Sequence, residues 1–475
     1  MTLRCQNIEF ESLTKEPTFR SDASFIFNDM VVSQHDYYCF DELFEFVTND
    51  DVDITQLGVF KYAEISNVSS DEEVSPVILD IDEQNDLNAN YFKKIAKGDI
   101  ISVKVDDILI SKVRPYLRKI ILVDNSNNDI YYTSSFIHIR PRKSPRLLFY
   151  LLKGHFISYV NSISRQGKGY PTITDRDLHY MKFEKSVVDK VLLNEETILS
   201  EITILENRIE GLKLRRIPDS EIIDSVFKRL FHWNYSSFQS QKEIKNYSVD
   251  LSTISGNYDL RMSAKFHRPA GSFVYSDIEK TNCLRIKNYI TEPITLGASV
   301  SPDDFDSCGD CYYISMATIK NFKVELDDTQ LLSERYVMQP KNSKKKVQKG
   351  DIIMTRSGAA IGKFALVEDD INAIHADFTM KIRLKNINLL YAYYYFRSVY
   401  FQYLIEINYK GLQNNNIFPS QIQEFPIPAV SLEQQNDIVE EIKQAIETQN
   451  KTKQEILELR KRIDELMEET IMDIK

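Results

Sequence analysis

Apolar residues recur at alternating intervals of four and three along two segments of the chain, one central and one at the C-terminus. This spacing forms the apolar seam of a coiled coil and predicts two long helices. Pro218 should end or bend the first helix, because proline lacks a backbone donor and clashes with the preceding turn. The predicted seam consists of Ile198, Ile202, Leu205, Ile209 and Leu212 in the first helix and Ile438, Ile442, Ile456, Leu459, Ile463 and Leu466 in the second.

Before each helical segment the pattern changes to short β-branched and aromatic runs bounded by turn residues, which indicates mixed α and β structure. Each stretch begins with an arginine phrase, at Arg20 and at Arg261. The pattern then predicts strands over 61–68 and 135–139 and a helix over 145–163 in the first stretch, and strands over 312–319 and 377–382 and a helix over 389–407 in the second.

The two stretches are copies of one sequence, 244 residues apart. Asp107–Val123 reads D-I-L-I-S-K-V-R-P-Y-L-R-K-I-I-L-V, and Asp351–Val367 reads D-I-I-M-T-R-S-G-A-A-I-G-K-F-A-L-V. We call these segments the Asp-Ile blocks. The same offset aligns Gly167–Leu178 with Gly411–Ile422. With the two residues that precede each of them, we call these segments the closing loops. Two blocks in register indicate a duplicated domain.

The pattern therefore predicts an α+β protein with pseudo-twofold symmetry. Two tandem mixed α/β domains are separated by two long helices that pair as an antiparallel coiled coil. The predicted boundaries are 1–185 and 233–430 for the domains and 186–232 and 431–475 for the helices. A helix of about 30 residues would hold the domains about 45 Å apart, at ~1.5 Å per residue. The alternative is that one helix dimerises with a second chain.

Composition bounds the class of protein. The chain of 475 residues has no apolar run long enough for a membrane span and no signal-peptide pattern, so we expect a cytoplasmic protein. Five cysteines argue against a disulfide framework. Cys308 and Cys311 have C-x-x-C spacing, but no second pair completes a zinc site, so we expect no metal.

The net charge of −11 disfavours nucleic acid only at first sight, because its distribution matters more than its sum. From Leu432 onward, 12 acidic residues face 7 basic ones, so this segment contributes −5. Two basic runs are candidate phosphate contacts, or else ordinary solvated faces. They consist of Lys341, Lys344, Lys345, Lys346 and Lys349, and of Arg140, Arg142, Lys143 and Arg146.

No catalytic motif is present in usable form. Gly358–Phe364 has only three residues between its glycines, and Phe364 stands where a phosphate loop would have Ser or Thr. No H-E-x-x-H, G-x-S-x-G or Asn-Pro-Pro-aromatic motif occurs. A nuclease site can be assembled from Asp219, Glu243 and Lys245 only by forcing a common pattern. We therefore expect a non-catalytic protein without a cofactor.

Cations and amides around the repeated blocks remain as candidates for binding. Cations in the Asp-Ile blocks suit phosphate contacts, and Asn, Gln, Arg or Lys in the closing loops can read adenine or guanine in the major groove. An ordinary Gly/Asn turn is the alternative. The candidates are Lys112, Arg114, Arg118, Lys119, Arg356 and Lys363 in the blocks, and Arg165, Lys168, Tyr170, Thr172, Thr174, Arg176, Lys410, Gln413, Asn414, Asn415 and Asn416 in the loops.

Gly411–Val439 resembles the closing signature of the specificity (S) subunits of type I restriction-modification enzymes. Their target recognition domains end in hydrophobic-Pro-hydrophobic-Pro, here Phe425–Pro428, followed by Glu-Gln and a long helix. Gly350–Lys363 resembles the family's other recurring phrase. The resemblance covers the whole chain, and the second copy is the closer match. In the first copy Met181–Glu184 replaces the proline stretch and Asp106 stands at the position of Gly350.

The resemblance implies a non-enzymatic reader of double-stranded DNA. Each recognition domain would grip the major groove of one half of a bipartite, asymmetric site. The helices would set the spacer, roughly 13 base pairs for 45 Å, and would dock adenine methyltransferase subunits that flip the target base. A translocating nuclease subunit can join such complexes. Two alternatives remain open from the residues: a divergent nuclease component, and a coiled-coil adaptor without DNA affinity.

Overall fold

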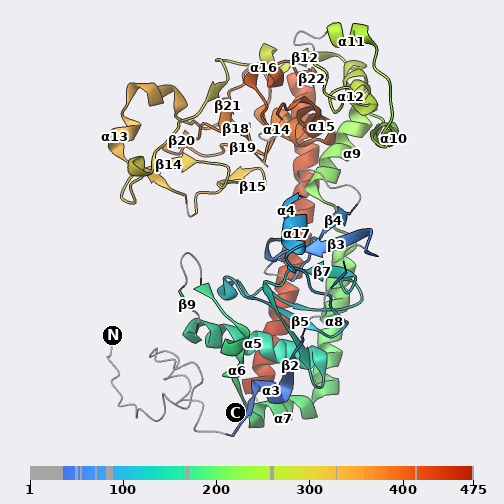
Figure 1. Ribbon diagram of the computed structural model, residues 1–475, viewed down its shortest axis with the longest axis vertical. Helices are drawn as coiled ribbons and strands as arrows, with labels where there is room; N and C mark the ends of the chain where they lie inside the picture. The colour runs from blue at the N-terminus through green and yellow to red at the C-terminus, as the bar shows by residue number, and fades with distance from the viewer. Residues whose placement is uncertain are drawn as a thin grey trace. The chain divides into compact units, whose positions relative to one another are not determined.

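The computed structural model divides the chain into two compact units. Unit 1 is Met1–Arg215 with Thr452–Lys475, and unit 2 is Arg216–Lys451. Helix α17 (Leu432–Met472) contributes residues to both units (Figure 1). The structure describes residues 36–48, 52–53, 56–69, 72–81, 89–163, 165–166, 171–256, 261–327, 329–358, 360–411 and 415–472. Arg20 lies outside these ranges.

Unit 1 is mixed α and β, with two principal sheets. A three-stranded sheet has the order β4-β3-β7, and a four-stranded antiparallel sheet has the order β2-β8-β5-β6. Strand β1 (Tyr37–Cys39) pairs with β11 (Lys182–Glu184). The sheet strands are β2 (Phe44–Phe46), β3 (Val59–Ala63), β4 (Val77–Asp80), β5 (Ile108–Ser111), β6 (Ile120–Leu122), β7 (Ile130–Tyr132) and β8 (Phe136–Pro141), and the helices are α3 (Phe40–Leu43), α4 (Ala89–Ile95), α5 (Pro145–Ile163), α6 (Asp175–His179), α7 (Lys185–Leu193) and α8 (Glu195–Lys213).

Unit 2 repeats this arrangement with additional strands and helices. Its sheets have the orders β17-β14-β20 and β13-β21-β18-β19-β16-β15, and β12 (Cys283–Arg285) pairs with β22 (Pro426–Pro428). The other elements are β13 (Thr295–Leu296), β14 (Cys311–Ile314), β15 (Ile319–Lys320), β16 (Lys323–Val324), β17 (Leu331–Leu332), β18 (Ile352–Thr355), β19 (Phe364–Leu366), β20 (Ala373–His375), β21 (Thr379–Ile382), α9 (Asp219–Phe231), α10 (Tyr235–Lys242), α11 (Leu251–Ser255), α12 (Pro269–Glu279), α13 (Glu334–Val337), α14 (Leu389–Arg397), α15 (Val399–Asn408) and α16 (Pro419–Ile422).

The duplication seen in the sequence is present in the strand registers. Ile108 pairs with Leu122 between β5 and β6, and Ile352 pairs with Leu366 between β18 and β19, 244 residues further on. In each three-stranded sheet, one outer strand is parallel and the other antiparallel to the central strand. The two units are therefore copies of one fold at the level of backbone pairing.

The two departures of the first copy from the second leave this backbone unchanged. Asp106 adopts φ +74° where Gly350 adopts φ +90°, and both amides donate to equivalent carbonyls over 2.8 Å. A non-glycine residue tolerates this left-handed region at a modest cost, and Asp is among the residues that do so most often. Similarly, β11 occupies the place of the proline-rich β22, because each pairs with the first strand of its unit.

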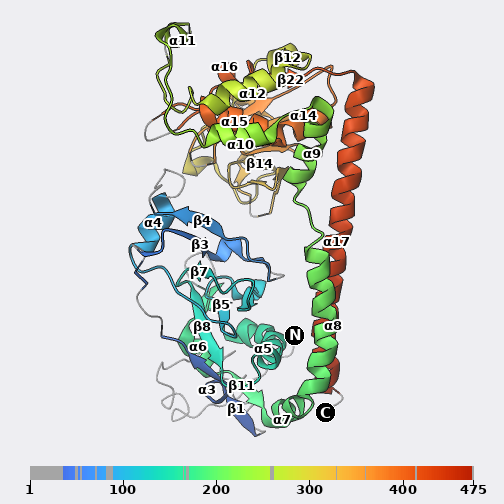
Figure 2. The same ribbon diagram turned by 90° about the vertical axis from the view of Figure 1, so that its right-hand side faces the viewer.

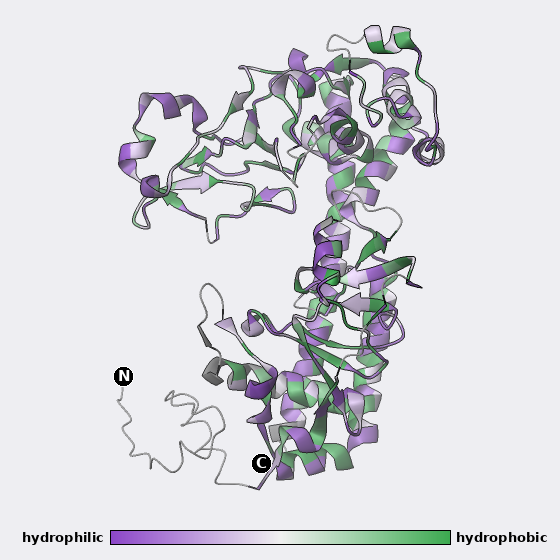
Figure 3. Ribbon diagram, in the orientation of Figure 1, coloured by the Kyte–Doolittle hydropathy of each residue, from purple (hydrophilic) through white to green (hydrophobic). Residues whose placement is uncertain are grey.

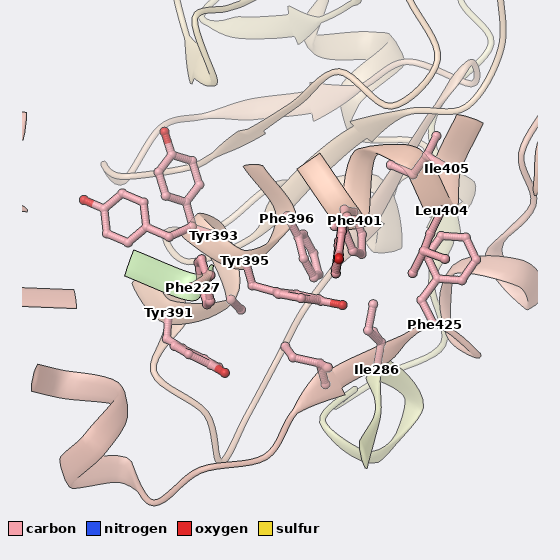
Figure 4. Close-up of a cluster of buried hydrophobic side chains, with 14 of the residues drawn as sticks. Phe227, Ile286, Tyr391, Tyr393, Tyr395, Phe396, Phe401, Leu404, Ile405 and Phe425 are labelled. Atoms are coloured by element: carbon pink, nitrogen blue, oxygen red, sulfur yellow. The ribbon is translucent and has the colours of Figure 1, made fainter. Parts of the chain in front are cut away.

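Aromatic side chains dominate the core of unit 2 (Figure 4). Phe396 stacks on Phe401 with ring centroids 4.2 Å apart. The buried hydroxyls of Tyr391 and Tyr395 donate to the carbonyls of Pro428 and Pro426, over 2.8 and 2.6 Å. Buried hydroxyls require such partners. These bonds attach the strand that follows the closing loop to helix α14, and so fix where that loop ends.

The predicted helix over 145–163 coincides with α5. The predicted helix over 389–407 is instead two helices, α14 and α15, which meet at Ser398. Ser398 is extended and its hydroxyl accepts the amide of Phe401, so it caps α15. The apolar pattern could not show this break because both helices bury aromatic residues on either side of it.

The apolar seams lie in the cores of both units. In unit 1, Ile198, Ile202 and Ile209 of α8 are buried in one cluster with Ile456 and Ile463 of α17. Figure 2 shows α8 beside this part of α17, and Figure 3 shows hydrophobic and hydrophilic residues alternating along α17. Leu205, Leu212 and Leu459 pack partly buried against the cluster, which also contains Leu466, while Ile438 and Ile442 are buried in unit 2.

The central helical segment is less regular than its sequence predicts. A single helix of about 30 residues was expected before Pro218, but α7 ends at Leu193 and α8 begins at Glu195. The Asn194 side chain donates to the carbonyl of Lys190 over 2.9 Å. Asparagine competes in this way with the helical backbone, and the four-three spacing carries no signal for it. Pro218 precedes α9 and is its N-terminal cap residue.

Helix α9 is attached to α14 and α15 by two acidic residues. Asp219 pairs with Arg397 at 3.0 Å. Asp224 accepts the amide of Val399 at 2.9 Å and the hydroxyl of Tyr235 at 3.1 Å. Burial raises the pKa of Asp224 from 3.8 to about 6, against the effect of these two hydrogen bonds. The charged carboxylate of Asp224 is therefore held at an energetic cost.

We expect Asp224→Asn to stabilise unit 2 at pH 8 by on the order of 1–3 kcal/mol. Between pH 3.8 and about 6 the folded protein binds a proton that the unfolded chain has lost, so stability falls as the pH rises through this window. An amide oxygen still accepts from Val399 and Tyr235 but carries no charge.

The measurement is urea unfolding at pH 4 and pH 8, followed by the emission of Trp233. This is the chain's one tryptophan and is buried in unit 2. Asp219→Asn is the control, since it leaves the largely buried Arg397 without its ion pair and should give no gain. An equal gain at both pH values for Asp224→Asn would contradict the assignment.

Candidate nucleic-acid interface

Each closing loop is hydrogen-bonded to the turn of its own Asp-Ile block. In unit 1 the amide of Ile173 donates to the carbonyl of Lys112 over 2.9 Å, and in unit 2 the amide of Ile417 donates to the carbonyl of Arg356 over 2.9 Å. These atoms are equivalent at the offset of 244 residues. Two segments about 60 residues apart in sequence are thus held together in the same way in both copies.

A second bond and an isolated bridge complete each junction. The amide of Arg114 donates to the carbonyl of Pro171 over 2.9 Å, and that of Gly358 donates to the carbonyl of Asn415 over 3.3 Å. Val113 bridges Thr172 at the position where Ser357 bridges Asn416. The backbone of the junction is therefore the same in both units, and only its side chains differ.

A buried aspartate anchors each Asp-Ile block. Asp107 is fully buried and accepts from the Lys104 amide (2.8 Å), His138 Nε2 (2.8 Å) and Arg140 Nε (2.7 Å). Burial alone would raise the pKa of Asp107, but the hydrogen bonds from His138, the Lys104 amide and Arg140 outweigh it and lower the pKa.

Asp351 has the same role in unit 2. It is fully buried and accepts from the Gln348 amide at 2.8 Å. Arg383 makes a bidentate pair with it, at 2.6 and 2.8 Å. Such pairs fix geometry as well as adding energy. Each aspartate thus holds the start of the strand that carries the block's turn.

In unit 1 the predicted phosphate contacts are mostly engaged within the protein. Lys112 Nζ donates to the carbonyl of Ser134 over 3.0 Å and lies 3.8 Å from Asp175. Arg118 donates to the carbonyl of Lys153 over 3.0 Å and lies 3.8 Å from Asp464.

Lys119 and Arg114 complete the set in unit 1. Lys119 Nζ donates to the carbonyl of Ile65 over 2.8 Å. Burial, and then Arg114, lowers the pKa of Lys119. Arg114 stands in the left-handed region at φ +50°, immediately before the short helix Pro115–Leu117. Arg118 and Lys119 therefore serve the fold of unit 1, and we leave them out of the interface.

In unit 2 the equivalent turn presents its cations differently. Lys363 is exposed, and among the described residues its side chain has no hydrogen-bond or ion-pair partner. The Arg356 guanidinium lies 5.7 Å from the centre of the Phe418 ring and donates to the carbonyl of Asp377 over 3.4 Å. Phe418 is 39% exposed at the edge of the closing loop. An exposed aromatic ring held by a cation is suited to contacting a base or sugar.

The structure describes only part of each closing loop. Lys168, Tyr170, Gln413 and Asn414 lie outside the described residues, as does the side chain of Arg165, whose backbone pairs with Thr172. Thr174 caps α6, with its hydroxyl donating to Asp177 over 2.8 Å, and Arg176 is exposed. Lys410 and Asn416 exchange two backbone bonds of 2.7 and 2.6 Å, and Asn415 and Asn416 are half-buried.

Arg261 supports the closing loop of unit 2, a role that the sequence did not reveal. Its Nη2 donates to the carbonyls of Ile407 and Tyr409, over 3.0 and 2.9 Å, at the C-terminus of α15. A cation is favourable there because terminal helical carbonyls lack intrahelical partners. Lys265 also donates to the Tyr409 hydroxyl. The repeated arginine phrase was the available signal, but nothing in it pointed to this contact.

In the described part of the chain, no group of three or more His, Cys, Asp or Glu is placed to hold a metal ion. Cys308 is exposed and Cys311 is buried in β14. None of the helices that the structure describes is both long and apolar enough to cross a membrane.

A protein-family model matches the part of the chain that contains the second copy of the repeated motifs. Residues 294–460 match the family model described as the type I restriction modification DNA specificity domain. This range contains the Asp-Ile block and closing loop of unit 2 and much of α17. No curated protein matches the chain.

Three solved structures are similar at low identity. The first is a structure described as showing the complex assembly and conformational transition of the type I R-M system. It is 16% identical to this chain, with a TM-score of 0.38, and the match covers 92% of this chain and 97% of that one. The HsdS subunit from Thermoanaerobacter tengcongensis is 15% identical (TM-score 0.34; 92% and 96%), and the type I S subunit from M. genitalium is 11% identical (0.34; 92% and 95%). The family-model match covers 167 of the chain's 475 residues, so this part of the chain is similar to the type I restriction modification DNA specificity domain.

Proposed function

We propose that this chain is the DNA-reading subunit of a restriction-modification or related phage-defence complex, and that each unit reads one half of a bipartite, asymmetric site through the major groove. It contributes no catalytic residue of its own. The partners are double-stranded DNA in the prokaryotic cytoplasm, adenine methyltransferase subunits and, in a restriction complex, a translocating nuclease subunit.

The junction between Asp-Ile block and closing loop carries this proposal. Its backbone bonds are equivalent in both units, whereas its side chains differ: Lys112 and Thr172 in one copy stand where Arg356 and Asn416 stand in the other. A fixed framework that presents different polar groups is what two readers of two different half-sequences require. Asn pairs with adenine edges and Arg with guanine edges.

We further propose that α8 and α17 set the spacer and dock the methyltransferase. Antiparallel order is supported within unit 2, in the segment after α8. The Ile217 amide donates to Gln449, and Arg229, later in the chain, pairs with Glu441, which is earlier in α17. Helix α17 has 41 residues, which is about 60 Å at ~1.5 Å per residue. The acidic excess from Leu432 onward suits a protein partner better than DNA.

The nuclease alternative has little support from the described residues. Asp219, the carboxylate it needs, is paired with Arg397 at 3.0 Å. Mutating Asp219 and Glu243 tests it directly, since cleavage by the isolated chain that these changes abolish would contradict our proposal. A coiled-coil adaptor without DNA affinity predicts instead no shifted DNA complex in the presence of methyltransferase.

The decisive experiment is to map methylated adenines in the host genome by long-read sequencing, with and without this gene. We expect a bipartite motif that disappears with the gene and returns on complementation. A motif that persists without the gene would overturn the proposed function.

Complementation with variants tests which residues read which half. We expect Asn415→Ala with Asn416→Ala to relax one half of the motif, because each lost base contact costs about 1–3 kcal/mol of discrimination. The other half should stay unchanged. Arg176→Ala should relax the opposite half, and the exposed Asn450→Ala on α17 is the control that should alter neither. Relaxation of both halves by either loop variant would contradict the division between units.

A further inference from the structure

The connection between the three-stranded sheet and the Asp-Ile block carries lysines in both units. In unit 1, residues 89–104 include α4 and run from β4 towards β5. In unit 2, residues 333–350 include α13 and the short helix Pro340–Lys345 and run from β17 to β18. Figures 1 and 2 show α4 beside β3 and β4. We call these segments the two basic connections.

Both basic connections have a strong excess of positive charge in a chain of net charge −11. The first has four lysines and one carboxylate, Asp99, so its net charge is +3. The second has one arginine, five lysines and one carboxylate, Glu334, so its net charge is +5. The lysines are Lys93, Lys94, Lys97 and Lys104 in the first and Lys341, Lys344, Lys345, Lys346 and Lys349 in the second.

Most of these lysines are directed to solvent without a carboxylate partner. Lys94 pairs with Glu64, and Lys341 lies over the Tyr336 ring. Within the described ranges, the remaining exposed lysines make no ion pair; they are Lys93, Lys97, Lys104, Lys344, Lys346 and Lys349. Asp99, the one carboxylate of the first connection, accepts from the hydroxyls of Thr133 and Ser134 and from the Ser134 amide, and it makes no ion pair with Lys93, Lys97 or Lys104.

The other basic run of the chain behaves differently and provides the contrast. Arg140 pairs with Asp107, Arg142 with Glu45 and Arg146 with Glu206, and Lys143 lies over the Tyr38 ring. That run stabilises unit 1 from within. The basic connections instead concentrate unneutralised cations, which repel one another unless a polyanion binds.

The backbone of the second connection is also fixed by two buried side chains. Lys381 is 4% exposed, and its Nζ donates to the carbonyls of Lys344 and Lys346 over 2.9 and 3.0 Å. Buried Asn342 donates to the carbonyl of Tyr336 over 2.8 Å. A backbone that is already ordered loses less entropy on binding a ligand. Burial, and then Lys381 and Lys345, lowers the pKa of the buried His375 to about 3, which is consistent with a positive potential here.

We propose that each basic connection binds the phosphate backbone of the duplex, beside the half-site that the closing loop of the same unit reads. This inference rests on the proposed function. Lys349 and Arg356 are seven residues apart and flank β18, so at ~3.3 Å per residue they lie at most about 23 Å from each other. The major groove is about 12 Å wide. A closing loop in the groove therefore leaves the connection within reach of the flanking phosphates.

The test is the salt dependence of DNA binding by the full chain assembled with its methyltransferase. Each phosphate contact contributes about −0.9 to the slope of log K against log salt concentration. We expect the triple variant Lys344→Gln, Lys346→Gln, Lys349→Gln to make the slope shallower by roughly 2–3 and to weaken specific and non-specific duplexes by the same factor. Lys93→Gln, Lys97→Gln, Lys104→Gln should act likewise through the other unit.

The matched control removes the same charge from unit 2 at paired lysines. Lys287, Lys320 and Lys323 are exposed and pair with Glu424, Glu325 and Glu368. Their triple change to Gln should leave the slope unchanged. An unchanged slope in the connection variants, with wild-type sequence preference, would overturn the phosphate contacts but not the reader function. A wild-type complex that binds no duplex overturns both.

Discussion

Asp107→Ala is expected to destabilise unit 1 by about 3–5 kcal/mol at neutral pH, because it removes the carboxylate from a buried ion pair. His138 and Arg140 would both lose a partner, and His138 is 5% exposed. The pKa of Asp107 is lowered in the folded state, so its contribution is present above pH 3.8 and is lost as the pH falls through the folded value. The effect of the substitution should therefore shrink in acid.

The repeat supplies the matched variant. Asp351→Ala removes the equivalent carboxylate from unit 2, and there the emission of Trp233 reports the loss. For Asp107→Ala, hydrogen exchange of β5 and β8 in urea gives the free energy of opening of unit 1. Full protection of β5 and β8 in Asp107→Ala at pH 7 would show that the buried pair does not stabilise the strand.

Much of the fold could be predicted because it depends on patterns that repeat. The Asp-Ile strand, the helix over 145–163 and the four-three seams each bury a regular apolar face, which sequence periodicity reports directly. The breaks could not be predicted. Asn194 and Ser398 each interrupt a helix through one polar side chain, and such local hydrogen bonds leave the apolar pattern intact.

The candidate site was predictable only in outline. The sequence indicated that the Asp-Ile block and closing loop belong together, and their bonds are in register in both units. It could not distinguish a lysine that faces solvent from one that donates to a distant carbonyl. Lys119 donates to Ile65, 54 positions earlier, whereas Lys363 at the equivalent place is exposed. Only the three-dimensional structure shows which of two equivalent cations faces solvent.

A chain that ends at Lys451 is expected to lose the fold of unit 1 while unit 2 remains folded. The C-terminal part of α17 buries Ile456, Ile463, Leu466 and Met467 in the core of unit 1. At about 1.5–3 kcal/mol for each buried side chain, the loss is roughly 6–12 kcal/mol as an upper estimate, which is the whole stability of a typical domain.

Ionic contacts would be lost with the same segment. Lys153 is 7% exposed and lies between Glu72 (2.7 Å) and Asp464 (3.2 Å), and Arg460 pairs with Glu72 at 3.0 Å. Removing Arg460 and Asp464 leaves the largely buried Glu72 and Lys153 paired only with each other. The C-terminal residues are therefore needed by the N-terminal unit, although they lie more than 200 positions from most of it.

Trp233 makes the outcome measurable, since its core in unit 2 keeps Ile438, Val439 and Ile442 of the shortened helix. We expect a buried-tryptophan emission to persist while far-UV helicity falls and proteases cut within 36–213. Ile463→Asn in the full chain should give the same result more weakly, and Lys461→Asn, at a side chain 78% exposed, should not. Protease resistance of 36–213 in the shortened chain would mean that unit 1 folds without the helix, and that α17 is only a connector.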